Sequence, residues 1–172
     1  MKNFELTNET IVNDCGVTLH RIKAVKDIIA PRFTVKAGEL GGFVEKVDNL
    51  DGDAWVFDNA RVYGNARVYG DARVYGNAWV YGDALVSDNA WVYSDAEVFR
   101  TNHYLVVGPI GSRDDYTTFF RSKDGVIKVK CGCFKGTTDE FLAKVEKTHG
   151  NSKYAKVYRM ATEMALAQID TN

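Results

Sequence analysis

Valine and alanine recur with a period of six residues through the middle of the chain. An alanine precedes each valine by two positions, and Leu50 and Val44 continue the valine register toward the N-terminus. Residues two apart on a β-strand point to the same side of it. We therefore expect Ala and Val to face inward and the residue between them to face outward. The valines are Val56, Val62, Val68, Val74, Val80, Val86, Val92 and Val98.

The other positions of each repeat are typical of turns. An aromatic residue follows each valine, with Ser87 as the single exception, and a small or turn-forming residue then precedes an Asn or Asp. Pairs such as Gly64-Asn65 tolerate positive φ angles. Strands this short cannot form a meander, but three of them can form one turn of a three-sided coil. The register from Val44 to Val98 contains ten positions, which predicts a little over three turns.

The motif V-Y-G-N-A-R resembles the hexapeptide repeat of left-handed parallel β-helix proteins. This resemblance implies a left-handed coil, an exception to the usual right-handed crossover, and homotrimers packed through the coil walls. The segment VKAGELGGFVEKVDNL and the Arg-Val-Tyr-Gly style of repeat resemble hexapeptide-repeat proteins encoded by phages and prophages. About three repeats are the minimum for a stable stack, and both ends need caps.

The segments on either side of the coil supply these caps. Residues 1–43 are expected to form an N-terminal β cap, with strand signals at 9–12 and 17–25, and Gly38, Gly41 and Gly42 mark the turn into the first coil. Residues 44–100 form the coil. Residues 101–172 are expected to form a small α+β domain. The expected fold class is therefore mainly β: a left-handed parallel β-helix of hexapeptide repeats between these two caps.

The C-terminal segment predicts a β-hairpin or small sheet followed by two helices. Alternating residues indicate strands within 104–134, with a turn at Lys123-Asp124-Gly125. Thr137 and Glu140 form a capping box for the first helix, and Gly150 stops it. Ser152 opens a second helix through about Ile169. One stripe of this helix contains Tyr154, Val157, Tyr158, Ala161, Met164 and Ala165.

Composition places the protein among ordinary globular chains of 172 residues, with 45% hydrophobic and 26% charged residues. No apolar run has the length of a transmembrane helix, and the N-terminus lacks an apolar signal core. Three cysteines fit a reducing compartment, so we expect a cytoplasmic protein, in the host cell if it is phage-encoded. Cys131 and Cys133 are interpreted as buried small hydrophobes rather than metal ligands, and no metal or other cofactor is expected.

Charge is unevenly distributed behind a net charge of −1. Residues 44–100 contain five basic and ten acidic residues, net −5, whereas residues 101–172 contain eleven basic and eight acidic residues, net +3. A generic nucleic-acid groove needs a stronger basic excess, so we do not expect one. A small anionic ligand would find more charge support in the C-terminal third.

The outward positions of the coil form the first set of candidate ligand-binding residues. Residues three repeats apart should stack in columns, and Arg between two Trp rings is favourable cation–π geometry. So large an aromatic surface indicates contacts, with self-association, a ligand groove and plain solvated decoration as the alternatives. The columns are Trp55, Arg73 and Trp91, then Arg61, Trp79 and Glu97, then Arg67 and Leu85, with Tyr75 beside the first.

A second candidate is the segment Gly111-Ser112-Arg113, which could present backbone N–H groups and a guanidinium to a phosphate. A tight loop between strands is the alternative interpretation. Lys128 and Lys130 could add charge if they face the same pocket, and are otherwise a solvated strand face.

These features favour a non-enzymatic protein that binds a small anionic ligand, such as a nucleotide signal sequestered in phage counter-defence. A protein-binding inhibitor is a close relative of this hypothesis. A self-assembling scaffold and a glycan-binding surface are alternatives. The resemblance also allows an acyltransferase with a catalytic His, but the repeats contain no His, and His103 just after them is the only candidate.

Overall fold

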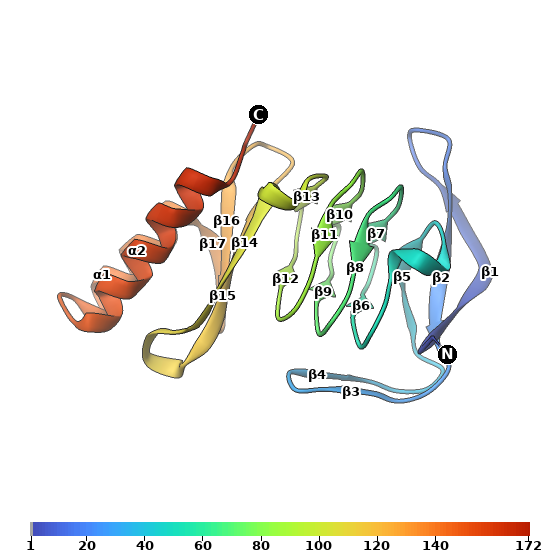
Figure 1. Ribbon diagram of the computed structural model, residues 1–172, viewed down its shortest axis with the longest axis horizontal. Helices are drawn as coiled ribbons and strands as arrows, with labels where there is room; N and C mark the ends of the chain where they lie inside the picture. The colour runs from blue at the N-terminus through green and yellow to red at the C-terminus, as the bar shows by residue number, and fades with distance from the viewer. Residues whose placement is uncertain (1) are drawn as a thin grey trace. The chain divides into compact units, whose positions relative to one another are not determined.

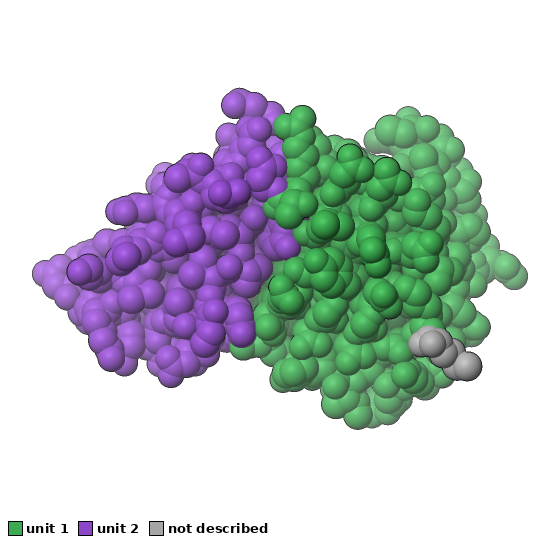
Figure 2. Space-filling model, viewed as in Figure 1, with its two compact units in different colours: residues 1–95, 99–101 green, residues 96–98, 102–172 purple. Residues whose placement is uncertain are grey.

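The computed structural model describes residues 2–172. By its internal contacts the chain divides into two compact units, coloured separately in Figure 2. The first, here the N-terminal unit, runs to Asp95 and includes Phe99–Thr101. The second, the C-terminal unit, comprises Ala96–Val98 and Asn102–Asn172. The N-terminal cap and most of the repeats therefore share one unit. The division into residues 1–43, 44–100 and 101–172 stays a prediction from the sequence pattern.

The repeats coil into a parallel β-solenoid, as predicted (Figure 1). Each two-residue strand pairs in parallel with the strand three repeats along, so β9 pairs with both β6 and β12. Three walls result, which we call the β6–β9–β12, β5–β7–β10 and β8–β11 walls. The strands are β5 (Leu40–Val44), β6 (Trp55–Val56), β7 (Arg61–Val62), β8 (Arg67–Val68), β9 (Arg73–Val74), β10 (Trp79–Val80), β11 (Leu85–Val86), β12 (Trp91–Val92) and, in the C-terminal unit, β13 (Glu97–Val98).

The inward direction of Ala and Val is confirmed. Every Ala and Val of the register between Ala54 and Val92 is at most 2% exposed. In the middle of the stack, Val74 lies in register with Val56 on one side and Val92 on the other. Burial of branched side chains inside the coil is the main force that holds these short strands together.

The corners of the coil require a left-handed backbone, and this explains the turn residues. Gly70 has a φ of +70°, and a Cβ built on it would lie 3.0 Å from the amide nitrogen of Asp88 in the next turn. Asp58, Asp88 and Ser94 occupy equivalent corners at φ values of 53°, 57° and 62°. Asp tolerates this region better than most L-residues because its short side chain can bond locally.

The N-terminal segment caps the coil with an antiparallel extension of one wall. Strands β1 (Phe4–Val12) and β2 (Thr18–Ala24) pair with each other, and β2 pairs with β5. Strand β5 then begins the coil, since Val44 pairs in parallel with Val62. Gly38 lies in the preceding turn, but Gly41 and Gly42 lie within β5. Their role is close approach, because a Cβ on either would lie 2.5 Å from a backbone oxygen of the coil.

A small hairpin that the sequence analysis missed lies against the coil. Strands β3 (Ile28–Ala30) and β4 (Phe33–Val35) form it, and Figure 1 shows it running along the edge of the solenoid. The Phe33 ring packs edge-on against Phe57, with ring centroids 5.8 Å apart. The hairpin therefore covers part of the β6–β9–β12 wall.

The C-terminal unit is a four-stranded antiparallel sheet with two helices packed on one face (Figure 1). Both helices were predicted, and their caps lie where expected: Thr137 and Glu140 form the capping box, Gly150 ends the first helix and Ser152 caps the second. No helix within residues 2–172 is long and apolar enough to cross a membrane. The elements are β14 (Tyr104–Ile110), β15 (Asp115–Arg121), β16 (Ile127–Cys131), β17 (Phe134–Thr137), α1 (Thr138–His149) and α2 (Lys153–Gln168).

The buried face of α2 is rotated from the predicted stripe. Tyr158, Ala161 and Ala165 are buried as expected, but Met164 is 53% exposed and Val157 is 36% exposed. Small residues on the other side of the stripe are buried instead, among them Ala155 and Thr162. The core also contains Phe119, Val129, Phe141 and Val145.

Candidate functional site

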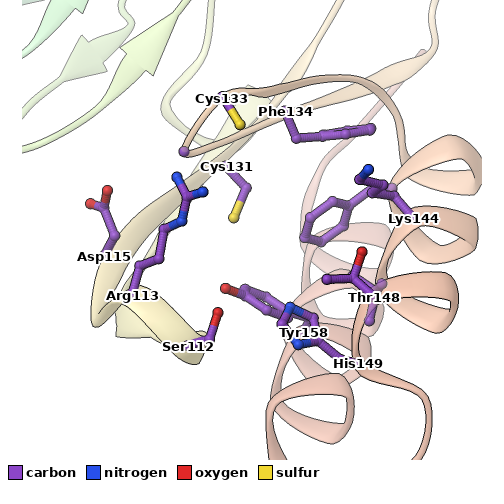
Figure 3. A pocket seen from close by; sticks show the side chains of 13 residues that line it. Ser112, Arg113, Asp115, Cys131, Cys133, Phe134, Lys144, Thr148, His149 and Tyr158 are labelled. Atoms are coloured by element: carbon purple, nitrogen blue, oxygen red, sulfur yellow. The ribbon is translucent and has the colours of Figure 1, made fainter.

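A hollow of about 120 Å³ lies within the C-terminal unit, between the sheet and the helices. We call it the C-terminal pocket. Figure 3 shows its side chains converging from several elements. Ser112 and Arg113 come from the short 3₁₀ helix Gly111–Arg113, and Asp115 comes from the start of β15. The two cysteines come from the end of β16 and the turn after it, and the remainder come from β17, α1 and α2.

One face of α1 forms the helical wall of this pocket. Phe141, Lys144, Val145 and Thr148 line it, and their spacing of three and four places them on one side of the helix. Phe141 and Val145 are buried and make an apolar floor, while Lys144 and Thr148 are exposed at its edge. An apolar base with a polar rim is the usual construction of a small-ligand site.

Tyr158 joins the helices to the opposite side of the pocket. Its hydroxyl hydrogen-bonds with Cys131 and with Ser112, and the Cys131 sulfur also accepts a hydrogen bond from Thr117 Oγ1 at 3.2 Å. Burial is the main reason that the pKa of the Tyr158 hydroxyl is raised above its ordinary value, and the Cys131 thiol adds to the effect. Tyr158 is therefore a neutral phenol at physiological pH. The His149 ring lies beside it, with centroids 5.7 Å apart.

The Arg113 guanidinium lies against the turn between β16 and β17. Cys131 pairs with Phe134 across this turn, and Gly132 has a φ of +55°. A Cβ on Gly132 would lie 2.9 Å from the Arg113 Nη1, so the absence of a side chain there leaves room for the guanidinium. Figure 3 shows Arg113 reaching toward the turn from the side opposite α1.

The pocket carries an excess of positive charge. Within residues 2–172, the side chains of Arg113 and Lys144 make no hydrogen bond or ion pair, and the His149 ring nitrogens make no hydrogen bond. The carboxylate that lines the pocket is Asp115, which already accepts the Tyr116 amide. Figure 3 places Asp115 on the outer side of Arg113, away from Tyr158. The C-terminal pocket is therefore lined by two permanent cations, Arg113 and Lys144, and by one carboxylate, Asp115, at its periphery.

The structure separates the residues proposed from sequence for this region. Ser112 and Arg113 line the pocket, whereas Gly111 shapes it by leaving room for Tyr158. Lys128 and Lys130 do not line it. The solvated-face interpretation is wrong for Lys130, which is 3% exposed, because its ammonium folds back to donate to the Gly132 carbonyl.

The interpretation of the cysteines as buried is also wrong. Cys133 is exposed and Cys131 is half-buried, because β16 ends at Cys131 and Cys133 lies in the turn. Both sulfurs lie at the pocket (Figure 3). In the described part of the chain, residues 2–172, no group of three or more His, Cys, Asp or Glu side chains is placed to hold a metal ion.

On the β6–β9–β12 wall, Trp55, Arg73 and Trp91 stack in register, as predicted. The Arg73 guanidinium lies 3.9 Å from the centroid of the Trp91 ring. The expectation that this column is displayed on the surface is wrong for Trp55 and Arg73, which are 1% and 6% exposed. The β3–β4 hairpin covers the wall here, with Phe33 on Arg73 at 5.5 Å.

The other two walls differ from the first. On the β5–β7–β10 wall, Arg61 is half-buried and lies 5.3 Å from the centroid of the Trp79 ring. Beside it, Tyr63 and Tyr81 stack with centroids 5.0 Å apart. On the β8–β11 wall, Arg67 is exposed, in register with the exposed Leu85.

Sequence reasoning missed the helical half of the C-terminal pocket. Lys144 and Thr148 were not singled out from the sequence, and Tyr158 was assigned only to the stripe of the second helix. Their spacing with Phe141 and Val145 was the available signal, since it puts polar residues at the border of an apolar face. His103, the candidate base of the acyltransferase hypothesis, is fully buried. A substrate cannot touch that ring in this conformation.

A family model described as the YdcK Beta solenoid repeat matches residues 60–76, 66–82 and 78–94. No curated protein matches the chain. The matched segments fall entirely within the coil and cover less than half of the chain, so the similarity concerns the repeat alone. The middle of this chain is therefore a β-solenoid of about three turns, similar in sequence to the YdcK β-solenoid repeat.

Proposed function

We propose that the protein binds a small anionic ligand in the C-terminal pocket and does not transform it. The observation that carries the proposal is the pair of cations Arg113 and Lys144, which lie on opposite sides of the pocket and make no hydrogen bond or ion pair within residues 2–172. A guanidinium and an ammonium held apart can clasp the oxygens of a phosphate or carboxylate. Ser112, Thr148 and Tyr158 add hydroxyl groups that can donate to the same anion.

The size of the pocket limits what it encloses. Pockets that bury a whole drug-sized ligand measure roughly 300–1,000 Å³, whereas this one measures about 120 Å³. It therefore encloses one anionic group rather than a complete nucleotide. A nucleotide ligand would place its terminal phosphate inside and its remaining parts at the mouth, over Cys133 and Arg113.

Within a cell, such a protein would act by sequestration. We propose that it is a phage-encoded, cytoplasmic counter-defence protein that withholds a nucleotide signal from the host. The resemblance of the repeat to phage and prophage proteins supports this role, as do hydrogen-bond donors and cations in a pocket with an apolar base. The same resemblance supports a left-handed coil of the hexapeptide type, whose handedness an experimental structure would reveal.

A ligand-release experiment tests the binding proposal. The purified protein is incubated with a mixture of nucleotides, washed and heated, and the released material is analysed by mass spectrometry. Intact phosphate-bearing nucleotide in the released fraction is the expected result. Released nucleotide that has been altered would indicate catalysis, and a fraction without any nucleotide would contradict the nucleotide assignment.

Matched variants locate the binding. Arg113→Gln and Lys144→Gln each remove one cation from the pocket and should each lower retention about tenfold, the loss of a charge-assisted contact. Lys147→Gln is the control, because Lys147 is an exposed lysine of the same helix outside the pocket. Equal retention by all three variants would place the ligand elsewhere.

Self-assembly is a second candidate function, favoured by the β8–β11 wall. This wall exposes apolar surface at Leu85, which is 40% exposed, and at Tyr69, which is 38% exposed. We propose that it is the contact face of a homo-oligomer, with a trimer as the preferred order. Light scattering coupled to size exclusion tests this: a trimer that becomes a monomer in Leu85→Lys supports it, and a monomeric wild type rules it out.

A further inference from the structure

A second hollow lies on the coil, on the β6–β9–β12 wall, and measures about 190 Å³. We call it the coil cleft. It is lined by Phe57, Asp58, Arg73, Tyr75 and Trp91, all within the N-terminal unit. Aromatic rings form most of this lining, so the cleft is an apolar slot rather than an ion-binding groove.

The rings that line the coil cleft are held by packing and are not free to collapse into it. Tyr75 stacks on Tyr93 at a centroid distance of 5.7 Å and lies tilted against Trp91 at 5.6 Å. Phe57 is fixed by its edge-on contact with Phe33 of the hairpin. Rigid aromatic walls lose little conformational entropy when a flat ligand enters between them.

The cation in this lining is already engaged. The Arg73 guanidinium lies 3.9 Å from the Trp91 ring centroid and donates to the Arg32 carbonyl at 3.3 Å. It is also 6% exposed, so it is part of the base of the cleft. Its charge is opposed by the Asp58 carboxylate in the same lining. The cleft thus carries no net charge, which favours a neutral ligand over a free anion or cation.

Asp58 supplies a hydrogen-bond acceptor at the edge of the coil cleft. It occupies a coil corner at a φ of +53°, and its Oδ2 accepts the Gly76 amide of the next turn at 3.2 Å. Among residues 2–172, its Oδ1 has no hydrogen-bond partner. A carboxylate oxygen at the rim of an aromatic slot can accept from an N–H group on the edge of a ring.

We propose that the coil cleft binds a neutral planar heteroaromatic ring that carries an amino group. The ring stacks among Tyr75, Trp91 and Phe57, and the amino group donates to Asp58. The volume fits this class of ligand, since an apolar cavity of about 150 Å³ accepts a benzene ring. Base-sized rings gain roughly 1–3 kcal/mol from stacking on an aromatic side chain. This site is separate from the C-terminal pocket and does not depend on it.

Two free bases of nearly equal shape provide the test. Adenine carries the exocyclic amino group and purine lacks it, so a titration of each, followed by ligand-observed NMR, isolates the Asp58 contact. We expect saturable binding of both, with adenine about tenfold tighter. Equal affinity would overturn the role of Asp58, and absence of saturable binding by either base would overturn the site.

The repeat itself offers matched variants. Asp58→Gly removes the carboxylate and places at this corner the residue found at Gly64, Gly70 and Gly76, so the coil tolerates it. Asp88→Gly makes the same change at another corner outside the cleft. Asp58→Gly should weaken adenine about tenfold and leave purine unchanged, and Asp88→Gly should alter neither. An unchanged adenine affinity in Asp58→Gly would overturn the proposal.

A second pair tests the stacking. Trp91→Leu should abolish binding of both bases, and Trp79→Leu should not, because Trp79 lies on another wall. Leu is accepted at an outward position at Leu85, and circular dichroism checks that both variants keep the coil. Arg113→Gln should leave adenine binding unchanged, which separates failure of this site from failure of the C-terminal pocket. Retained binding in Trp91→Leu would overturn the assignment.

Discussion

The Tyr158 hydroxyl lies so close to Gly111 that a Cβ on Gly111 would overlap it. Gly111 also has a φ of +76°, which L-residues rarely adopt. The glycine therefore serves two purposes, the turn out of β14 and the docking of Tyr158. Through this contact the phenol reaches Ser112 and Cys131 and closes one side of the C-terminal pocket.

Gly111→Ala should damage both stability and binding. The new methyl group must displace Tyr158 from the core, and the backbone strain adds to that cost, so we expect a loss of roughly 2–4 kcal/mol in the free energy of unfolding. Denaturant unfolding measures it, and anion retention should fall at the same time. Gly125→Ala is the control: its φ is +75°, but its Cβ meets only an ordinary contact at 3.4 Å. A Gly111→Ala variant no weaker than this control would refute the packing argument.

Salt should weaken ligand binding in the C-terminal pocket. Arg113 and Lys144 are exposed cations, and the Debye length falls from about 10 Å at 0.1 M to about 3 Å at 1 M ionic strength. We expect the affinity for inorganic phosphate to fall about tenfold over this range. Adenine binding in the coil cleft should stay nearly constant, and calorimetry at several salt concentrations measures both. A phosphate affinity that does not respond to salt would speak against the two cations.

Truncating a valine inside the coil should cost far more than truncating one on the surface. Val74 is fully buried between Val56 and Val92. Val74→Ala removes two methyl groups' worth of packing and leaves a void, at a cost of roughly 2–3 kcal/mol in unfolding free energy. Val126→Ala should cost under about 0.5 kcal/mol, because Val126 lies at the surface. Thermal unfolding of both variants checks this, and comparable losses would mean that the coil interior is not packed as described.

Alkaline pH should destabilise the C-terminal unit through Tyr158. Its pKa in the folded protein is raised above the ordinary value of 10.0, mainly by burial. The folded state thus holds the proton where the unfolded state releases it, so stability is complete below pH 10.0 and falls as the pH rises through the folded pKa. Tyr158→Phe should show a smaller loss above pH 10.0 than the wild type, measured by denaturant unfolding at each pH. Identical pH profiles would show that Tyr158 titrates normally.

The coil was predictable because its information is local and repeated. Each Ala and Val independently predicts an inward-facing side chain, and residues such as Gly64 and Asp58 each predict a turn at the same position of the repeat. Agreement among so many repeats does not arise by chance. The helix caps at Thr137 and Ser152 were predictable for a related reason, since a cap depends on residues three positions apart. Local signals of this kind need no knowledge of the rest of the fold.

The C-terminal pocket and the covering of the β6–β9–β12 wall were harder to predict from the sequence, because they depend on packing between segments far apart in the chain. Nothing near Trp55 in sequence says that a hairpin ending at Val35 will cover its wall. Lys144 and Arg113 line the same pocket only because α1 packs against β16 and β17. The β3–β4 hairpin was not predicted because its strands have only three residues each. Strands this short give no clear alternation of apolar and polar residues.

An amide NMR titration of the full chain with inorganic pyrophosphate tests the central claim most directly. We expect saturable shifts confined to the amides of Ser112, Arg113, the turn at Gly132 and the helix from Lys144 to His149. The same titration of Arg113→Gln should need about tenfold more ligand. Shifts that never saturate, or that fall on lysines outside the pocket such as Lys147 and Lys153, would contradict the proposal that this protein holds an anion between Arg113 and Lys144.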